Sequence, residues 1–577
     1  MTGSLHPVAG IPDDVPDLAR FADAVAAHIN GGVLAQAADH DQAPVFISRA
    51  PGRLDVMGGI ADYSGALVLQ WPIREATRVA LRPWRERRIV IVSTGPQGHT
   101  RRCEVPLALV ADGERPYDEV RAWFAADPTR HWAAYVAGVF HVLAREHAVR
   151  FEHGAAVLIE SDVPEGRGVS SSAAIEAATM EAVIAAWPLR IEPRLRALRC
   201  QQVENLIVGA PCGVMDQMAT IHGEAGSLMA LLCQPAEFQG SIRLPAELGV
   251  WGIDSGIRHA VSGADYGAVR VGAFMGYRVL AALAGLRVTP GDREGHVRVD
   301  DPRWHGYLAN VGGNGFRRFA PDIPEELDGD AFLAHYQGTT DLVTRVDPSH
   351  RYAMRTPAAH PVHEHERVME WARQLRADPD PRRLGALMYE SHASYSACGL
   401  GSDGTDRLVA LARGAGATAG IYGAKITGGG SGGTVAVLAD VGARDAVQGI
   451  ALRYAEETGR AAHVFEGSSP GAARIGAIRL DPADDGHRAR SVANNGLSPT
   501  HSEDCLGGAR EALVRYGCCP TASVMMSCSV QSARATMPVR RPSCITATRS
   551  LIWRISSMSL LIIRIDTPSC VRPRSRR

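Results

Sequence analysis

A glycine- and serine-rich segment, 163–176, combines the residue types that bind phosphate. It reads Val-Pro-Glu-Gly-Arg-Gly-Val-Ser-Ser-Ser-Ala-Ala-Ile-Glu. Gly166 and Gly168 let the backbone turn tightly and approach a ligand. The serines at 170–172 then begin a predicted helix, whose free N–H groups and positive dipole end favour an anion. The segment predicts a polyphosphate site, although it is not a Walker A loop; a serine-rich helix cap is the alternative.

Two carboxylates further along the chain could complete a phosphoryl-transfer site. Glu204 lies on a predicted helix, and Asp216 follows a turn rich in glycine and proline at 209–213. One carboxylate could hold a magnesium ion, and the other could orient or deprotonate a hydroxyl. Each would be an ordinary surface acid if it stood alone.

A second glycine-rich segment, 49–65, carries side chains suited to a polyhydroxylated ligand. Arg53, Asp55 and Asp62 are expected in a turn between two strands. Carboxylates at such a turn can accept hydrogen bonds from vicinal hydroxyls. A charged hairpin exposed to solvent is the alternative.

A third segment, 423–435, contains the run Thr-Gly-Gly-Gly-Ser-Gly-Gly-Thr. Flexible linkers have this composition. The run lies between Ile421-Tyr422 and an apolar strand, however. We therefore expect a tight backbone loop that packs against a ligand or another loop.

Helices and strands surround these motifs in an irregular order. Apolar periodicity predicts helices at 15–29 and 132–143, and an alanine-rich helix follows the phosphate-binding segment and ends at Pro188. Strands are predicted at 45–47, 66–69, 88–93, 155–160, 435–438 and 476–480. This order favours an α+β fold over a doubly wound sheet.

The bulk composition excludes several classes of protein. A chain of 577 residues is long enough for two or more domains. The net charge of −1 offers no field that would attract nucleic acid or an anionic membrane. We find no signal peptide, no apolar run of membrane-spanning length and no zinc-like spacing among the 11 cysteines. We expect a cytoplasmic protein with small-molecule partners, as a monomer or weak dimer.

The composition changes abruptly after about residue 482. The stretch 483–577 is rich in arginine, serine and cysteine and has no acidic residue between Glu511 and Asp566. We hypothesise an irregular tail that arises from a frameshifted or wrongly assigned reading frame. A functional basic arm is the alternative.

Taken in order, the three glycine motifs and the two carboxylates resemble the GHMP kinase superfamily, in its galactokinase-like branch. The resemblance runs from about 44 to 481 and includes the phrases Trp-Ala-Ala-Tyr-Val at 132–136 and Pro-Cys-Gly-Val-Met-Asp-Gln at 211–217. It implies an α+β fold with two kinase domains, 44–245 and 246–482, after an N-terminal helical extension, 1–43. ATP and a sugar would bind in the cleft between the domains.

The resemblance also implies a role for individual residues. The transferred group would be the γ-phosphoryl of ATP, and the acceptor would be the anomeric hydroxyl of a sugar. Asp216 would be the catalytic base beside Arg53, and Ser172 and Glu204 would coordinate Mg²⁺. The residues expected to wrap the ATP phosphates are Gly166, Gly168, Ser170, Ser171, Ser172 and Ala173. Those expected to contact the sugar are Arg53, Asp62, Asp216 and Tyr266, with Arg258 also retained.

One departure from the galactokinase pattern concerns the sugar. Galactokinases carry Gly-Glu-His-Thr-Asp-Tyr, whose Glu and His lie near the 6-hydroxymethyl group, whereas this chain reads Gly-Gly-Ile-Ala-Asp-Tyr at 58–63. A buried hydroxyl without a partner costs ~1–3 kcal/mol. We therefore expect a sugar that lacks this group, such as L-arabinose. The segment is also similar to plant L-arabinokinases, which carry an additional N-terminal region, so this chain would be the kinase module alone.

Three alternatives stay open at this stage. The chain could be a galactokinase, or a kinase for a 6-deoxygalactose such as D-fucose, whose methyl group Ile60 would tolerate. It could also be a sugar sensor without catalytic activity.

Overall fold

The computed structural model describes residues 12–28, 32–36, 43–95, 99–258 and 264–481, with the backbone of 546–555 and 559–568. The chain forms two compact units, Met1–Asn495 and Gly496–Arg577. In the described part of the second unit, β18 (Thr546–Ile555) pairs antiparallel with β19 (Ser559–Pro568). The rest of the tail predicted at 483–577 lies outside the described residues. All other elements belong to the first unit.

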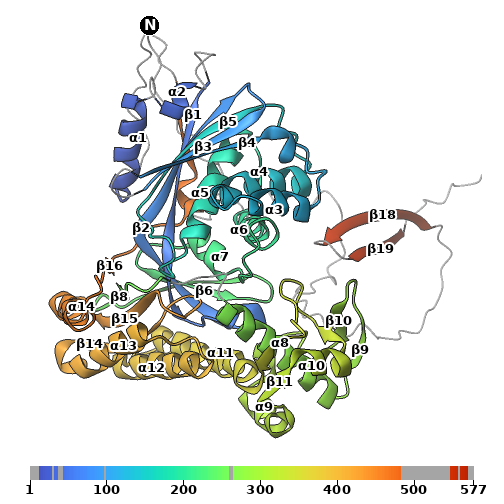
Figure 1. Ribbon diagram of the computed structural model, residues 1–577, viewed down its shortest axis with the longest axis vertical. Coiled ribbons are helices and arrows are strands. Elements are labelled where there is room, and N and C mark those ends of the chain that lie inside the picture. The colour runs from blue at the N-terminus through green and yellow to red at the C-terminus, as the bar shows by residue number, and fades with distance from the viewer. Residues whose placement is uncertain are drawn as a thin grey trace, which may run out of the picture. The chain divides into compact units, whose positions relative to one another are not determined.

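An eight-stranded sheet forms one half of the first unit (Figure 1), with strand order β17-β1-β2-β5-β3-β4 and with β6 and β7 joined through β2. Its strands are β1 (Val45–Met57), β2 (Leu67–Trp84), β3 (Arg88–Thr94), β4 (Thr100–Pro106), β5 (Gly154–Ser161), β6 (Ser227–Leu232), β7 (Glu237–Arg243) and β17 (Ala477–Leu480). Every residue of β1 is buried, because elements cover both faces of this strand.

Helices pack on both faces of this sheet, and Figure 1 shows α1 and α5 on opposite sides of it. Leu18, Phe21 and Val25 recur at helical spacing on α1 and pack against β1, β2 and β5. The covering helices are α1 (Pro16–His28) and α2 (Gly32–Gln36) on one face and α3 (Tyr117–Ala125), α4 (Ala134–His147), α5 (Ser171–Ala186), α6 (Pro193–Gln202), α7 (Met215–His222) and α15 (Ala472–Ile475) on the other.

A four-stranded sheet with order β14-β15-β8-β16 organises the other half of the first unit. Its strands are β8 (Leu248–Asp254), β14 (Ile421–Ile426), β15 (Thr434–Asp440) and β16 (Val464–Glu466). Alternate residues of β15 face different helices, as the strand period of two requires. Val435 and Val437 pack with α13 (Asp403–Ala415) and α14 (Arg444–Thr458), whereas Ala436 and Leu438 share a core with α11 (Arg355–Arg376) and α12 (Pro381–Ala397).

A smaller set of elements follows α8 (Ala264–Leu283) and shares a hydrophobic core with it. We call residues 287–353 the intervening segment. It contains β9 (Arg287–Pro290), β10 (Gly295–Asp300), α9 (Gly313–Phe319), β11 (Glu326–Asp328), α10 (Gly329–Tyr336), β12 (Gly338–Thr339) and β13 (Arg351–Ala353). Among the described residues of the first unit, short 3₁₀ turns lie at Asp62–Ser64, Leu107–Leu109, His131–Ala133, Leu308–Val311, Ala320–Asp322 and Ala417–Ala419.

The structure confirms the predicted α+β class, and each helix and strand expected above is present. The strands predicted at 45–47 and 66–69 are much longer than expected, because β1 continues to Met57 and β2 to Trp84. The predicted location of Arg53 and Asp55 is wrong, because both lie on β1 and not in a turn. The strand continues through two irregular positions, between Pro51 and Arg53 and between Asp55 and Met57. Bulges of this kind redirect side chains without ending a strand. The predicted division at 43/44, 245/246 and 482/483 stays a prediction.

Candidate active site

The glycine- and serine-rich segment forms a loop that ends at the N-terminus of α5. Gly166 and Gly168 adopt φ values of 72° and 71°, and Ser170 at the helix N-cap has a φ of 62°. Glycine reaches this left-handed region at little cost, which explains the two glycines. The helix begins at Ser171, so its first N–H groups and the positive end of its dipole lie where the loop ends. This is a suitable geometry for phosphate groups.

The third glycine segment packs directly on this loop. A Cβ atom at Gly433 would lie 2.9 Å from Arg167 O, and one at Gly428 would lie 2.9 Å from Gly168 O. Thr434 Oγ1 also donates to Arg167 O at 2.8 Å. The expected tight backbone loop is therefore present, and the neighbour that requires its glycines is the phosphate-binding loop.

Asp216, in the first turn of α7, accepts three hydrogen bonds beside this loop. Arg53 donates to Asp216 Oδ1 from Nη2 at 2.7 Å and from Nε at 3.0 Å. Ser170 Oγ donates to Asp216 Oδ2 at 2.6 Å. Arg53 Nη1 donates to Gly168 O at 2.7 Å, so one guanidinium joins the carboxylate to the loop. Burial lowers the pKa of Arg53, but the nearby charges of Asp216 and Asp55 and the hydrogen bonds to Asp216 together outweigh burial, so the pKa of Arg53 is raised.

A pocket opens in front of Asp216 and holds about 640 Å³ of space that is continuous with solvent. Nearly all of the predicted site residues line it, namely Arg53, Asp62, Gly166, Gly168, Ser170, Ser171, Ser172, Glu204, Asp216 and Tyr266. Ala173 does not, because it is fully buried in α5. Arg258 is exposed and is not part of the lining. Sequence reasoning did not single out Cys212, Gly213 or Met215, which also line the pocket.

Glu204 lies in a buried cluster of acids at one side of this pocket. It sits on a π-helical turn, η5 (Val203–Val208), where a simple α-helix was expected. Burial and the neighbouring Asp216 raise the pKa of Glu204 to about 7, although the Ser172 hydroxyl donates to it. Gln217 Nε2 donates to Glu204 at 2.6 Å and to the buried Glu176 at 3.2 Å. Burial and Glu204 also raise the pKa of Glu176.

Asp62 is buried at another side of the pocket, and its Oδ1 has no hydrogen-bond partner. Burial and the nearby Asp216 raise its pKa to about 6, while Arg270 opposes the shift. Its carboxylate lies against Gly213, where a Cβ atom would be 1.7 Å from Asp62 Oδ2. A buried acceptor without a partner is costly unless a ligand supplies a donor. The arrangement therefore suits a ligand with hydroxyl groups.

The two residues that depart from the galactokinase pattern differ in their orientation. Ile60 lines the pocket and is fully buried, with a φ of 50°. A β-branched residue rarely adopts such a φ, and such strain is concentrated at functional sites. Gly59 does not line the pocket: a Cβ atom there would lie 1.6 Å from Tyr395 Oη and 2.1 Å from Asp55 Oδ2. Of these two residues, only Ile60 therefore contributes apolar surface to the pocket.

Asp55 faces away from the pocket and forms a fully buried ion pair with Lys425 at 2.8 Å. Gln70 and Tyr395 also donate to its carboxylate, at 2.9 and 3.2 Å. Asp55 is therefore not available to a ligand, contrary to the expectation that it joins Asp62 in binding hydroxyls. Lys425 is the only lysine of the sequence.

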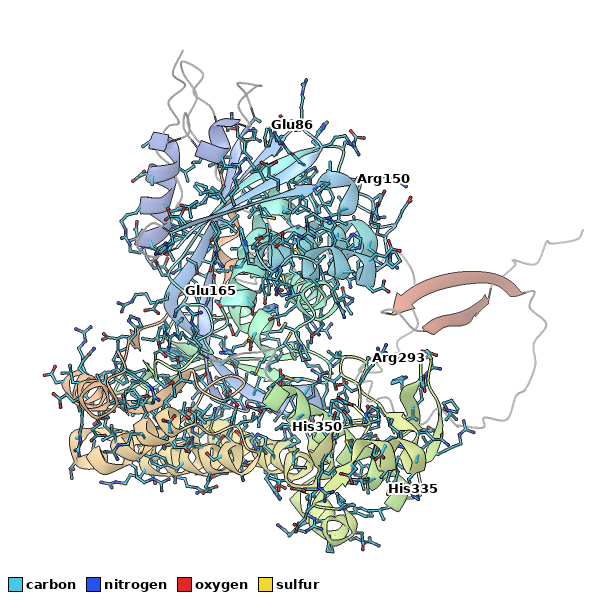
Figure 2. All side chains as sticks on the ribbon, in the orientation of Figure 1. Glu86, Arg150, Glu165, Arg293, His335 and His350 are labelled. Atoms are coloured by element: carbon cyan, nitrogen blue, oxygen red, sulfur yellow. The ribbon has the colours of Figure 1, made fainter. Side chains whose placement is uncertain are left out.

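A second pocket, with about 1110 Å³ of space that is continuous with solvent, adjoins the phosphate-binding loop. It shares Gly166, Ser171 and Ser172 with the first pocket. Its other lining residues include the rings of His131, Trp132 and Tyr135, with Arg101, Glu165, Ile175 and Val208. Figure 2 labels Glu165, where the helices and strands around the eight-stranded sheet meet the rest of the first unit. Trp132 and Tyr135 belong to the segment Trp-Ala-Ala-Tyr-Val at 132–136, one of the sequence matches to the kinase family. Sequence reasoning assigned no pocket to this segment.

Metal sites built from protein side chains alone are absent from the described part of the chain, where no three His, Cys, Asp or Glu side chains could hold an ion. No helix within the described residues has the length and apolar character needed to cross a membrane.

Three family models match this chain. The GHMP kinases N terminal domain matches residues 134–224, the GHMP kinases C terminal model matches 371–456, and the Galactokinase galactose-binding signature matches 35–83. The first range includes Asp216, the second includes α12, α13 and most of α14, and the third includes Arg53 and Asp62. The matches thus cover all of the residues that line the first pocket except Tyr266.

Known proteins resemble the chain over most of its length. It is 44% identical to L-arabinokinase of Arabidopsis thaliana over 485 residues, which are 76% of this chain and 47% of that protein. The chain therefore spans about half the length of that relative. It is 31% identical to galactokinase of Chloroflexus aggregans over 421 residues, which are 72% of this chain and 90% of that protein.

A solved structure, Lactococcus lactis galactokinase complexed with galactose, has the same fold with a TM-score of 0.59. The match covers 79% of this chain and 99% of that protein, at 19% identity. Because both GHMP kinase models match and a galactokinase aligns over 90% of its length, the chain belongs to the GHMP kinase family, in its galactokinase-like branch.

Proposed function

We propose that this protein transfers the γ-phosphoryl group of ATP to the anomeric hydroxyl of L-arabinose. The observation that carries the proposal is the position of the phosphate-binding loop between two pockets, with Asp216 and Ile60 lining one of them. The nucleotide would occupy the pocket lined by Trp132 and Tyr135, and the sugar would occupy the pocket lined by Asp62 and Asp216. Gly166, Ser171 and Ser172 line both and would hold the phosphates.

Asp216 and Arg53 would act on the sugar hydroxyl. In this step the anomeric oxygen attacks the γ-phosphorus, its proton passes toward Asp216, and ADP leaves. Phosphoryl transfer depends mainly on positioning and on stabilisation of charge. The hydrogen bonds from Arg53 and Ser170 fix the Asp216 carboxylate at 2.6 to 3.0 Å, so it is oriented before the sugar binds. Arg53 would also stabilise negative charge near the loop.

Ser172 and Glu204 supply oxygen atoms that fit a magnesium ion. Glu204 is buried beside Asp216, and its burial together with the repulsion from Asp216 raises its pKa to about 7. A divalent cation would relieve this repulsion, and Mg²⁺ prefers one or two carboxylates together with phosphate oxygens. When bound, Mg²⁺ would neutralise charge on the ATP phosphates.

Ile60 supports a pentose as the preferred sugar. With the anomeric hydroxyl at Asp216 and a ring hydroxyl at Asp62, we place ring position 5 toward Ile60. An apolar wall offers no partner to a 6-hydroxymethyl group, and an unpaired hydroxyl costs ~1–3 kcal/mol. L-Arabinopyranose has the galactose configuration at positions 1 to 4 and lacks this group. The A. thaliana relative at 44% identity, named L-arabinokinase, supports the same substrate.

An assay of phosphoryl transfer from ATP to L-arabinose tests the proposal, and the rate of the Asp216→Asn variant is compared with that of wild type. We expect product phosphorylated at carbon 1, a requirement for Mg²⁺ and a kcat that is lower by ~10²-fold or more in the variant. Asp301→Asn is the control, because Asp301 is remote from both pockets and binds Tyr277. Equal rates for wild type and Asp216→Asn would contradict the assigned role. A wild type that binds sugar without any transfer would indicate a sensor instead.

A further inference from the structure

The intervening segment reaches the sugar pocket through one buried ion pair. Its residues, 287–353, lie between the matched GHMP kinase domains, which end at 224 and begin at 371. Figure 2 labels Arg293, His335 and His350 on this part of the chain. None of its residues lines either pocket described above. Any influence on the sugar must therefore pass through another side chain.

Arg270 of α8 is that side chain. It lies one helical turn after Tyr266, which lines the pocket, so the two residues share a face of α8. Arg270 Nε donates to Asp341 Oδ2 and Nη2 donates to Asp341 Oδ1, both at 2.8 Å. Both side chains are almost fully buried. Two parallel bonds in a buried site fix the guanidinium in one orientation.

Asp341 is itself held rigidly in a turn. It accepts hydrogen bonds from Val343 N at 3.0 Å and from Thr344 Oγ1 at 2.6 Å. Arg293 Nη2 binds the backbone of the same turn, at Leu342 O, at 2.6 Å. The carboxylate has no freedom to follow a displaced arginine, so the intervening segment determines where Arg270 lies.

The remaining nitrogen of Arg270 points to the wall of the sugar pocket. Arg270 Nη1 donates to Cys212 O at 3.3 Å. Asn205 Nδ2 donates to the same carbonyl at 3.3 Å, and Cys212 N donates to Asn205 Oδ1 at 2.9 Å. The next residue, Gly213, is the one against which the Asp62 carboxylate packs. The guanidinium also lies over the ring of Tyr63, 5.3 Å from its centroid. Arg270 thus contacts the residue that precedes Gly213 and the residue that follows Asp62, without lining the pocket itself.

We propose that Arg270 and Asp341 are a positioning pair that fixes the Cys212–Gly213 wall against Asp62 and thereby sets sugar affinity. The inference rests on the proposed function, since it assigns Asp62 to the sugar. The pair would affect the sugar and not the nucleotide, because neither Cys212 nor Asp62 lines the second pocket.

The test compares the double variant Arg270→Gln/Asp341→Asn with wild type in the full chain. Neutral amides at both positions avoid an unpaired buried charge, which would unfold many proteins. We expect KM for L-arabinose to rise at least ~10-fold while KM for MgATP stays within about twofold. Arg270→Lys keeps the charge but loses the two-pronged geometry, so it should rescue sugar KM only in part.

Arg196→Gln/Glu181→Gln is the matched control. This pair is equally buried, with bonds of 2.8 Å, and lines neither pocket. The control should lower thermal stability without changing either KM. An unchanged sugar KM in the folded Arg270 variants, or an equal rise of both KM values, would overturn the proposal.

Stabilisation by sugar gives a second measurement that does not need turnover. If wild type transfers no phosphate but L-arabinose or D-galactose raises its Tm, the proposed function fails. The role of the Arg270–Asp341 pair is then tested by the Tm shift itself, which should be lost in the double variant. If neither sugar stabilises wild type, both proposals fail.

Discussion

At the scale of single residues, Ile60 carries most of the argument about substrate. It is a β-branched residue at a φ of 50° in the pocket wall, and strained residues of this kind are concentrated at functional sites. Gly59 has a different role: Tyr395 and Asp55 fill the space that its side chain would need. The glycine is therefore required by packing, and only Ile60 contacts the pocket.

Replacing Ile60 with Asn should widen the choice of sugar. Asparagine tolerates the left-handed φ, and its amide can pair with a 6-hydroxymethyl group. We expect the ratio of kcat/KM for D-galactose to that for L-arabinose to rise ~10-fold or more. Ile60→Val is the control, because it keeps an apolar wall and should keep the pentose preference. Steady-state kinetics with both sugars would measure this, and an unchanged ratio in Ile60→Asn would contradict the role of the wall.

The raised pKa of Asp62 predicts an acid limit to sugar binding. Its pKa of about 6 in the folded protein lies above the ordinary 3.8, so the group protonates as the pH falls through 6. A protonated Asp62 loses a hydrogen-bond acceptor for sugar hydroxyls. At saturating MgATP, kcat/KM for the sugar should fall ~10-fold per pH unit below 6, since this ratio reports the free enzyme. Asp62→Asn should be less active and should not show this fall in kcat/KM below pH 6. If the fall persists in the variant, the titration of another group causes it.

Sequence reasoning identified most of the pocket lining, because residues such as Asp62, Ser172 and Asp216 lie in short motifs. It did not identify the pairs that hold the pocket together. Arg270 and Asp341 are 71 positions apart, and Lys425 and Asp55 are 370 apart. No local period or spacing connects such residues, so only the folded structure brings them into view.

At the scale of elements, the phosphate-binding loop and the third glycine segment form one unit. Their backbones are in contact at Gly433 and Gly428. The composition of the third segment alone would also have been compatible with a flexible linker. The deciding signal was the apolar strand after the run, now β15. The π-helical turn that presents Glu204 had no signal in the sequence.

Gly433→Ala should disturb the loop through this contact. The residue has a φ of 76°, and the new Cβ atom would lie 2.9 Å from Arg167 O. We expect a loss of ~1–3 kcal/mol in the free energy of unfolding and a higher KM for ATP. Gly449→Ala in α14 is the control, because its Cβ atom would meet nothing within 4 Å and should add ~0.5–1 kcal/mol of stability. A KM for ATP in Gly433→Ala equal to that of wild type would contradict the idea that the third glycine segment supports the phosphate-binding loop.

At the scale of the whole molecule, the Asp55–Lys425 pair joins the eight-stranded and the four-stranded sheets of the first unit. Asp55 lies on β1 of the eight-stranded sheet, and Lys425 lies on β14 of the four-stranded sheet. Asp55 N also donates to Thr427 Oγ1 at 2.5 Å. The contact therefore fixes the two halves on which the pocket residues stand.

Lys425→Met should lower the free energy of unfolding by ~3–5 kcal/mol, because it leaves the Asp55 charge buried without its partner. The double variant Asp55→Asn/Lys425→Met should recover at least half of that loss. Urea titration would measure both. Arg298→Gln, which removes an exposed pair with Asp292, should change stability by less than ~1 kcal/mol. Equal losses in the single and double variants would show that charge burial is not the cause.

The most direct test of the central claim is a comparison of kcat/KM for L-arabinose, D-galactose and D-fucose with the wild-type protein and MgATP. The apolar wall at Ile60 predicts that L-arabinose exceeds D-galactose by ~10-fold or more, with D-fucose between them because its methyl group needs no partner. A preference for D-galactose over L-arabinose would contradict the account.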